Sequence, residues 1–118
     1  SVSRFYDTDW LRLEGGMNFT GATLVFETLA HARCAVSVAL DHKNTFKYKK
    51  YYSLTPKQPD DEYVSVRYDL PPVLTEWVNV RIEFLPSLAG NPTLRSGALH
   101  VLPVEKQDIL RSANKSQA

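Results

Sequence analysis

The sequence predicts an all-β protein built as an antiparallel β-sandwich, with a closed barrel as the alternative. Short runs in which apolar and polar residues alternate recur along the chain, as expected for strands that bury one face. Turn-forming residues separate these runs about every 8–12 residues, a spacing typical of sandwiches. Helical periodicity is nearly absent, apart from about two turns expected at residues 105–111.

Seven segments carry the strand pattern, and each ends where turn-forming residues begin. Two prolines and two aspartates fill residues 55–61, which are therefore expected to form a loop. Pro71-Pro72 separates the two most regular runs, so we expect a longer connection there, crossing between the sheets. A long segment rich in Gly, Pro and Asn (86–97) precedes the last strand. The expected strands are 10–14, 22–29, 32–41, 45–54, 62–70, 76–85 and 98–104.

The in-phase apolar residues of these strands predict the core. The longest alternation lies in 76–85, and it places Ile82 at the centre of the core and Arg81 on the outer face. This phase predicts a loss of about 2–5 kcal/mol for Ile82→Ala and of no more than about 0.5 kcal/mol for Arg81→Ala. The expected core residues are Leu24, Phe26, Cys34, Val36, Val38, Leu40, Phe46, Val64, Val66, Tyr68, Leu70, Val78, Val80, Ile82, Phe84, Leu99 and Val101.

Composition and charge limit the classes of partner. The 118 residues fit one domain, expected at 1–104 with a tail or linker at 105–118, and the abrupt start indicates a module of a longer protein or a processed chain. The net charge of +1 makes nucleic acid an unfavoured partner. No apolar run is long enough for membrane insertion. Cys34 is the single cysteine, so no internal disulfide forms, and its phase predicts a buried thiol.

The outward positions of 62–70 and 76–85 form the candidate binding surface. Exposed tryptophan is scarce because its large apolar area favours burial. Aromatic rings can stack on the C–H face of a sugar, while Arg and Asn bond its hydroxyls. The alternatives are a plain solvated face and a tryptophan packed beneath a loop. The candidate ligand-binding residues are Tyr63, Arg67, Trp77, Asn79 and Arg81.

The strand at 32–41 carries small outward residues, Ala35, Ser37 and Ala39. If it lies beside the two strands above, these residues leave a shallow trough between the rings and the hydrogen-bond donors. The alternative is that the 86–97 loop or the C-terminal tail covers them. Farther along, four lysines alternate with aromatic residues in 43–52. Such a pattern can bind single-stranded nucleic acid or an anionic glycan, but on an edge strand lysines also prevent edge-to-edge pairing.

Catalytic and metal-binding motifs are absent from the sequence. His31, His42 and His100 are scattered, and none has the short spacing of a metal-binding pair. No nucleophile elbow, phosphate-binding glycine loop or C-x-x-C motif occurs. We therefore expect no enzyme, no catalytic residues and no cofactor. The acidic clusters Asp7/Asp9 and 60–62 leave a structural calcium ion as an unsupported alternative.

Three stretches carry a family resemblance: WLRLEGGMNFTGATLVFETL near the start, YVSVRYDLP followed by EWVNVRIEFLP in the middle, and SGALHVLPV at the end. Together they resemble the galactose-binding-like jelly-roll sandwiches that include many carbohydrate-binding modules. The resemblance spans about residues 10–104 and implies a jelly-roll-like, non-catalytic glycan-binding module attached to a larger protein. It transfers no binding residue, because the binding positions of those families are not matched one by one.

The leading hypothesis is a carbohydrate-binding module whose partners are a polysaccharide or glycan and the rest of a parent protein. An extracellular or cell-surface location follows if that hypothesis holds. The alternative is a protein–protein interaction or assembly domain, since interfaces are also enriched in aromatic residues and Arg. An enzyme comes third and would require a carboxylate pair or a histidine-centred cluster formed by folding.

Overall fold

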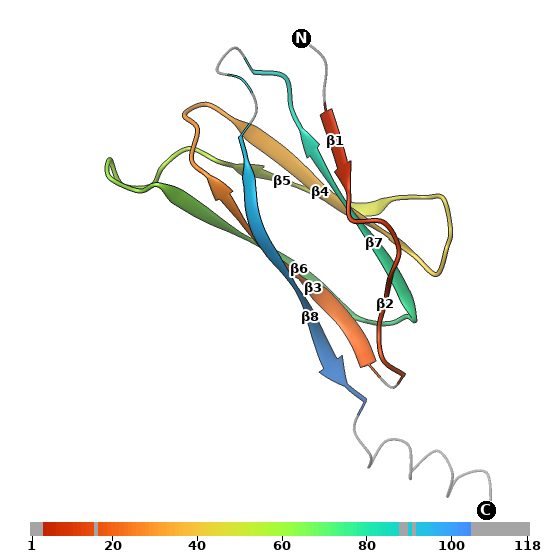
Figure 1. Cartoon of the computed structure of the whole chain (residues 1–118). Helices are drawn as coiled ribbons and strands as arrows, with labels where there is room; N and C mark the ends of the chain where they lie inside the picture. Colours follow the sequence, from red (N-terminus) through yellow and green to blue (C-terminus); the bar gives the residue numbers. More distant parts are fainter. Residues whose placement is uncertain (1–3, 16, 88–89, 91, 105–118) are drawn as a thin grey trace, which may run out of the picture.

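A computed structural model describes residues 4–15, 17–87, 90 and 92–104 of the chain. In this part all regular structure is β, and every strand pair is antiparallel. The strands form two open sheets facing each other (Figure 1), so the predicted antiparallel sandwich is confirmed and the barrel alternative is wrong. The tail at 105–118 and the helix expected at 105–111 lie outside the described residues.

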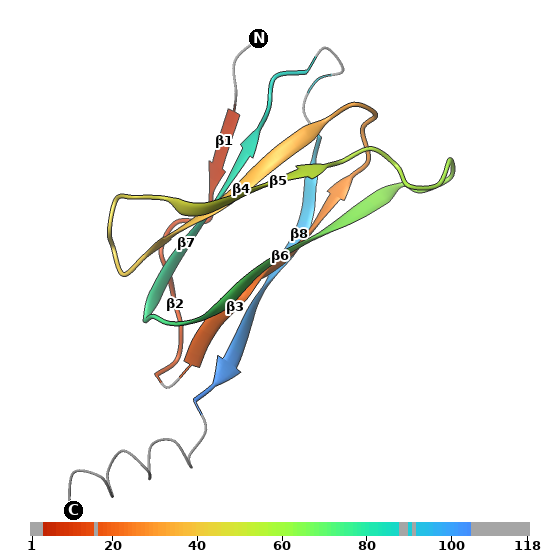
Figure 2. The same ribbon diagram turned by 180° about the vertical axis from the view of Figure 1, so that it is seen from behind.

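Sheet A has the order β1-β7-β4-β5, and β2 also pairs with β7. Sheet B has the order β6-β3-β8 and lies across the core from sheet A (Figure 2). The strands of sheet A are β1 (Arg4–Asp7), β2 (Leu11–Arg12), β4 (Arg33–Leu40), β5 (Lys47–Ser53) and β7 (Trp77–Phe84). The strands of sheet B are β3 (Met17–Glu27), β6 (Tyr63–Leu74) and β8 (Leu94–Pro103).

Sheet A is wider than sheet B, and the additional strand position lies at one side of the sandwich. β4 pairs with β7 along residues 78–84, so β1 and β2 share the other edge of β7, one after the other. Sheet A is therefore four strand positions wide, whereas sheet B has three. Because β5 and β6 are in contact at the opposite side, the unmatched position lies opposite β1 and β2, beside β8.

The core between the sheets contains most of the predicted residues. The alternation in β4, β6 and β7 is confirmed, since every residue expected there is buried except Phe84, which is partly buried against the core. Leu99 and Val101 are also partly buried. Phe46 is a wrong prediction, because it lies outside the core beneath Arg81 on the outer face of sheet A. The core residues that the alternation did not predict are Leu13, Phe19, Ala32 and Leu54.

Phe19 was not predicted because the expected strand began at residue 22, whereas β3 begins at Met17 and contains a bulge. The pairing register shifts between Phe19 and Gly21 against both β6 and β8. The extra residue reverses the parity of the strand, so odd-numbered Phe19 and even-numbered Leu24 both face the core. Gly21 has φ +134°, and a Cβ there would lie 1.8 Å from the carbonyl oxygen of Tyr68. Only glycine therefore fits at this bulge.

Pro71-Pro72 does not end the strand, contrary to the prediction. β6 continues to Leu74, and the connection to β7 consists of Thr75 and Glu76 alone. The prolines are tolerated because β6 is an edge strand and because they lie opposite the bulge of β3, where pairing is interrupted. The predicted crossing between sheets is confirmed, but it is short.

Candidate functional site

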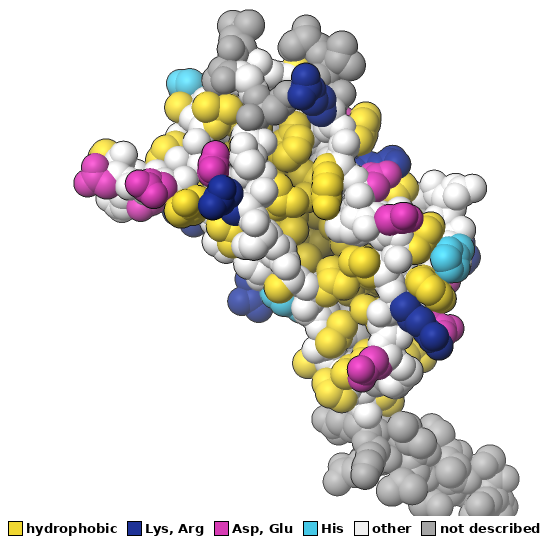
Figure 3. Space-filling model, viewed as in Figure 1, with side chains coloured by type: hydrophobic (Ala, Val, Ile, Leu, Met, Phe, Trp, Pro, Cys, Tyr) yellow, Lys and Arg dark blue, Asp and Glu magenta, His cyan; other side chains and the backbone are white. Residues whose placement is uncertain are grey.

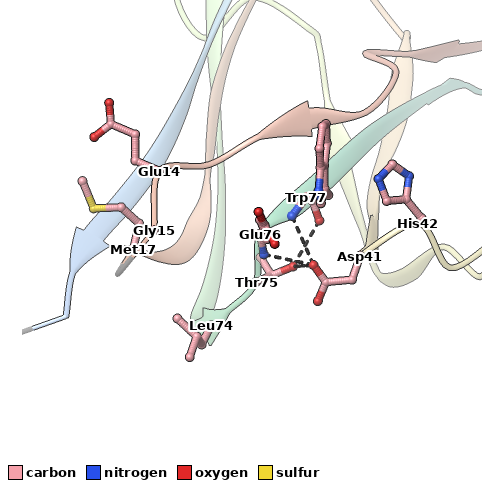
Figure 4. Close-up of a pocket in the computed structure, with 9 residues that line it drawn as sticks. All are labelled: Glu14, Gly15, Met17, Asp41, His42, Leu74, Thr75, Glu76 and Trp77. Atoms are coloured by element: carbon pink, nitrogen blue, oxygen red, sulfur yellow. Dashed lines mark hydrogen bonds between the residues drawn. The ribbon is translucent and has the colours of Figure 1, made fainter. Parts of the chain in front are cut away.

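Trp77 borders a surface hollow of about 540 Å³ at one end of sheet A. Asp41 lines this hollow, and Figure 4 shows its carboxylate facing the start of β7. Its Oδ1 accepts hydrogen bonds from the Thr75 hydroxyl at 2.8 Å and from the backbone N–H groups of Glu76 and Trp77 at 2.9 and 3.1 Å. Burial raises the pKa of Asp41, but these hydrogen bonds outweigh it, so the pKa lies below its ordinary 3.8.

Aromatic rings line one side of the hollow. The His42 imidazole lies between two indoles, with ring centroids 4.6 Å from Trp10 and 4.7 Å from Trp77. The guanidinium of Arg12 lies 6.0 Å from the Trp77 ring and forms an ion pair with Glu76 at 3.1 Å. The indole of Trp77 is thus half-buried among neighbours of its own chain, and only part of it faces solvent.

On the outer face of sheet A, Asn79 is buried and Arg81 is bonded to another residue of the chain. Asn79 is buried, and its Oδ1 has no hydrogen-bond partner in the described part of the chain. Arg81 binds both carboxylate oxygens of Asp7, at 2.7 and 3.0 Å, and lies 3.7 Å above the Phe46 ring. The hydrogen bond from Arg81 lowers the pKa of Asp7 and raises that of Arg81. Neither side chain is free to bind a ligand in this arrangement.

The predicted trough over β4 is filled. Its three small residues are almost completely buried on this outer face, with exposures of 1% for Ala35, 3% for Ser37 and 0% for Ala39. Side chains of the flanking strands cross above them, because Lys49 of β5 bonds Glu83 of β7 at 3.0 Å. The Arg81–Phe46 contact crosses in the same way. Among the described residues, the cover is therefore made by β5, β7 and the loop before β5, while the tail named in the alternative lies outside them.

The predicted site residues do not share one surface. Tyr63 and Arg67 lie on β6 in sheet B, whereas Trp77, Asn79 and Arg81 lie on β7 in sheet A. Outward side chains of the two sheets point to opposite sides of a sandwich, so the prediction that these residues share one face is wrong. Arg67 is exposed and pairs with Asp69 at 3.0 Å.

A second hollow opens between the sheets, beside β8. We call it the inter-sheet cleft, and it has a volume of about 190 Å³. Figure 3 shows a strip of hydrophobic side chains there, between β8 and the β1–β2 edge. No charged residue lines it, and two large apolar side chains on its rim, Tyr6 and Leu11, are exposed. The lining residues are Tyr6, Thr8, Leu11, Ala22, Leu24, Val80, Ile82, Leu94, Gly97, Ala98 and Leu99.

The opposite edge of the sandwich is closed by side chains. The Tyr68 hydroxyl donates to the carbonyl of Tyr48 at 2.8 Å, and the Tyr52 hydroxyl donates to the carbonyl of Arg67 at 3.2 Å. Lys50 Nζ donates to the carbonyl of Asp69. Burial raises the pKa of the Tyr68 hydroxyl, which keeps it protonated as a donor. These bonds connect β5 and β6 across the two sheets.

Chemical groups for catalysis or metal binding are not gathered in the described residues. No group of three or more His, Cys, Asp or Glu side chains there could hold a metal ion. His100 bonds Thr23 at 2.8 Å in sheet B, far along the chain from His42. Cys34 is buried, and burial raises its pKa to about 12. The described residues also contain no helix able to cross a membrane.

No family model, curated protein or solved structure matches this chain. The resemblance to galactose-binding-like sandwiches therefore stays a prediction, and the function is argued from the geometry alone.

The residues of the inter-sheet cleft were not predicted as a site. β1 was missed because it has only four residues, RFYD, in which the two aromatic residues are adjacent and do not alternate with the polar ones. The start of β8 was assigned to the loop because of its Gly, Pro and Asn neighbours. The sequence carries little signal for this site, because the exposure of Tyr6 and Leu11 is apparent only once β1 and β2 are placed beside β7.

Proposed function

We propose that this protein is an interaction or assembly domain whose inter-sheet cleft binds an extended polypeptide strand. The observation that carries the proposal is the unequal width of the sheets: sheet A presents β1 and β2 opposite a position that no described strand of sheet B fills. A strand added beside β8 would occupy that position about 4.8 Å from β8 and cover the apolar lining.

The chemistry of the cleft defines the strand that would fit. Its lining is uncharged, so side chains entering it must be apolar. Alternate residues of a strand point to opposite faces, so the partner would alternate apolar and polar residues. Each Val or Leu side chain buried there would contribute about 1.5–3 kcal/mol, before the cost of ordering the segment. Backbone bonds to the free edge of β8 would set its direction.

Panning a display library of random ten-residue peptides on the wild-type chain and on Leu11→Asp tests this proposal. Leu11 is exposed on the rim, so Leu11→Asp places a charge in the cleft without emptying the core. We expect wild type alone to enrich peptides with alternating apolar residues, and Ala30→Asp, in an exposed loop, to behave like wild type. Enrichment of the same peptides by Leu11→Asp, or of none by wild type, would contradict it.

The second candidate function is carbohydrate binding at the Trp77 hollow. The Trp77 indole, the His42 ring packed against it and the carboxylates that line the hollow favour it, because sugars need both an aromatic surface and polar partners. Glycan arrays and affinity gels of wild type and Trp77→Ala test it, with Tyr63→Ala on sheet B as the matched control. A signal lost in Trp77→Ala and kept in Tyr63→Ala supports this candidate, whereas no signal with any glycan rejects it.

A further inference from the structure

The position of β1 and β2 limits which strands can pair with β8. They lie opposite the space beside β8, about 10 Å away across the two layers. A strand of another folded sandwich brings a second sheet with it. On the side of sheet A, that sheet would need the space that β1 and β2 already fill. On the other side, the incoming strand would turn its polar, solvated face to the uncharged cleft. A strand that carries no sheet of its own avoids both conflicts.

β8 itself is open to such a strand. It is ten residues long, contains no lysine, and has its single proline at the last position, Pro103. Lysines and prolines are the usual protection of a sheet edge, and the other long edge strands have them. β5 carries three lysines, and β6 contains Pro71-Pro72. The sole described pairing of β8 is with β3, so the backbone groups of its other edge can bond a strand placed there.

One core-facing position of β8 has no side chain. Leu94, Leu99 and Val101 of this strand pack against the core. Gly97 lies on the same face, because a Cβ built there would lie 3.1 Å from Cδ2 of Leu24, and the next nearest atom is 3.8 Å away. The φ of Gly97 lies outside the left-handed region, so the backbone does not require glycine. The missing side chain therefore leaves room in the inter-sheet cleft.

The size of the cleft suits a single ring. Its volume is about 190 Å³, and an apolar cavity of about 150 Å³ is large enough to bind benzene. The buried side chains of Val80 and Ile82 line it from sheet A, and the exposed side chains of Tyr6 and Leu11 line its rim. A second ring of the same size would exceed this volume.

We propose that the bound strand is an unfolded linear segment of a partner chain, which inserts one aromatic side chain beside Gly97. This inference rests on the interaction function proposed above and names the class of segment and its anchor. In a strand paired with β8, the residue opposite Gly97 points to the same side of the sheet as a side chain at position 97 would. Its ring would then fill the room at Gly97, while a residue opposite Leu99 meets a leucine and must be smaller.

Two matched variants of β8 test the anchor. Gly97→Val places two methyl groups in the cleft and keeps a residue that favours strands. Ser96→Val adds the same side chain at an exposed position that pairs with Val25 on the outer face. Peptides that wild type enriches from the ten-residue library should share an aromatic residue at one position. We expect the affinity of the most enriched peptide, measured by fluorescence anisotropy, to fall about tenfold or more with Gly97→Val and to stay within about twofold with Ser96→Val.

Variants of the peptide provide a test that does not depend on how Gly97→Val folds. Replacing its aromatic residue with Ala should weaken binding to wild type about tenfold or more and binding to Gly97→Val much less, because the two changes remove the same contact. Grafting the same sequence into the edge strand of a folded β-sandwich should also weaken binding about tenfold or more.

The outcomes separate this inference from the proposed function. Enriched peptides without a shared aromatic position, or equal losses on wild type and on a folded Gly97→Val, overturn the anchor at Gly97. A grafted strand that binds as tightly as the linear peptide overturns the requirement for an unfolded segment. Each of these results leaves the proposed function intact, provided that Leu11→Asp abolishes the enrichment. A wild type that enriches no peptide overturns both.

Discussion

The two long edges of this sandwich differ in whether the side chains between the sheets are covered. At the closed edge, β5 and β6 face each other, and the hydroxyls of Tyr52 and Tyr68 donate to backbone carbonyls across the gap. At the open edge, β1 and β2 extend sheet A beyond β8, and the inter-sheet cleft exposes apolar side chains. The comparison teaches that a side chain facing inward is buried only when a strand lies opposite it.

Two tyrosines that both face inward give the largest expected contrast. Tyr68 at the closed edge is 0% exposed, whereas Tyr6 at the open edge is 49% exposed. We expect Tyr68→Ala to lower the free energy of unfolding by about 3–5 kcal/mol and Tyr6→Ala by about 1 kcal/mol or less. Urea denaturation at low protein concentration measures both. Equal losses would mean that the cleft is closed in solution.

A residue at the base of the inter-sheet cleft should contribute to stability as a core residue does. Ile82 borders the inter-sheet cleft but is 0% exposed, so Ile82→Ala should cost about 2–5 kcal/mol. Arg81 stacks on Phe46 and binds Asp7, so Arg81→Ala should cost about 1–2 kcal/mol, more than the sequence predicts. Urea melts separate the two variants. An Arg81→Ala loss as large as that of Ile82→Ala would refute the strand phase.

Acid should weaken the attachment of β1 beside the open edge. The hydrogen bond from Arg81 lowers the pKa of Asp7 in the folded chain. A lowered folded pKa stabilises the protein above the ordinary value of 3.8, and this stabilisation is lost as the pH falls through the folded pKa. Asp7→Asn should cost about 0.2–1 kcal/mol at pH 7, since the pair is about one-third exposed and screened.

Unfolding free energies from pH 7 to about pH 2 measure this dependence. We expect Asp7→Asn to flatten the acid limb of the stability curve relative to wild type. Asp60→Asn, at an exposed loop position, provides the control. An acid limb as steep in Asp7→Asn as in wild type would show that the ion pair is not formed in solution.

Thiol labelling compares the two edges without changing stability much. Cys34 lies opposite Tyr52 near the closed edge, and its raised pKa of about 12 leaves roughly one thiolate in ten thousand at pH 8. We expect native Cys34 to resist a thiol reagent that labels the urea-unfolded chain at once. Leu11→Cys in a Cys34→Ala background should react quickly in the native state, and equal rates would contradict an open cleft.

The sequence predicted the strands and their inward faces well, because alternation is a local property. The error of phase at Phe46 occurs at a bulge, because the irregularity at Tyr48 turns Phe46 outward. Phe19 was missed because the predicted strand began at residue 22, beyond the bulge at Gly21. A bulge adds one residue and leaves little trace in composition. Cys34, Tyr68 and the β7 core followed the predicted phase.

The candidate site could not be predicted in the same way. Alternation shows which residues share one face of a strand, but not which strands are neighbours. Trp77 and Arg67 were grouped because their strands are consecutive, yet the chain crosses to the other sheet through Thr75 and Glu76. The inter-sheet cleft depends on pairings between β1 and β7, about 75 residues apart, which no local pattern records.

The placement of β1 and β8 has a mechanical consequence. β1 starts at one end of the sandwich and β8 finishes at the other, and both run the same way along it (Figure 1). Each is bonded to an antiparallel neighbour, β7 or β3. Tension pulling Arg4 and Pro103 apart would load both strands along their axes. Their ladder bonds would then be sheared together, instead of being unzipped one by one, so the domain should resist stretching in this direction more than a pull across its sheets.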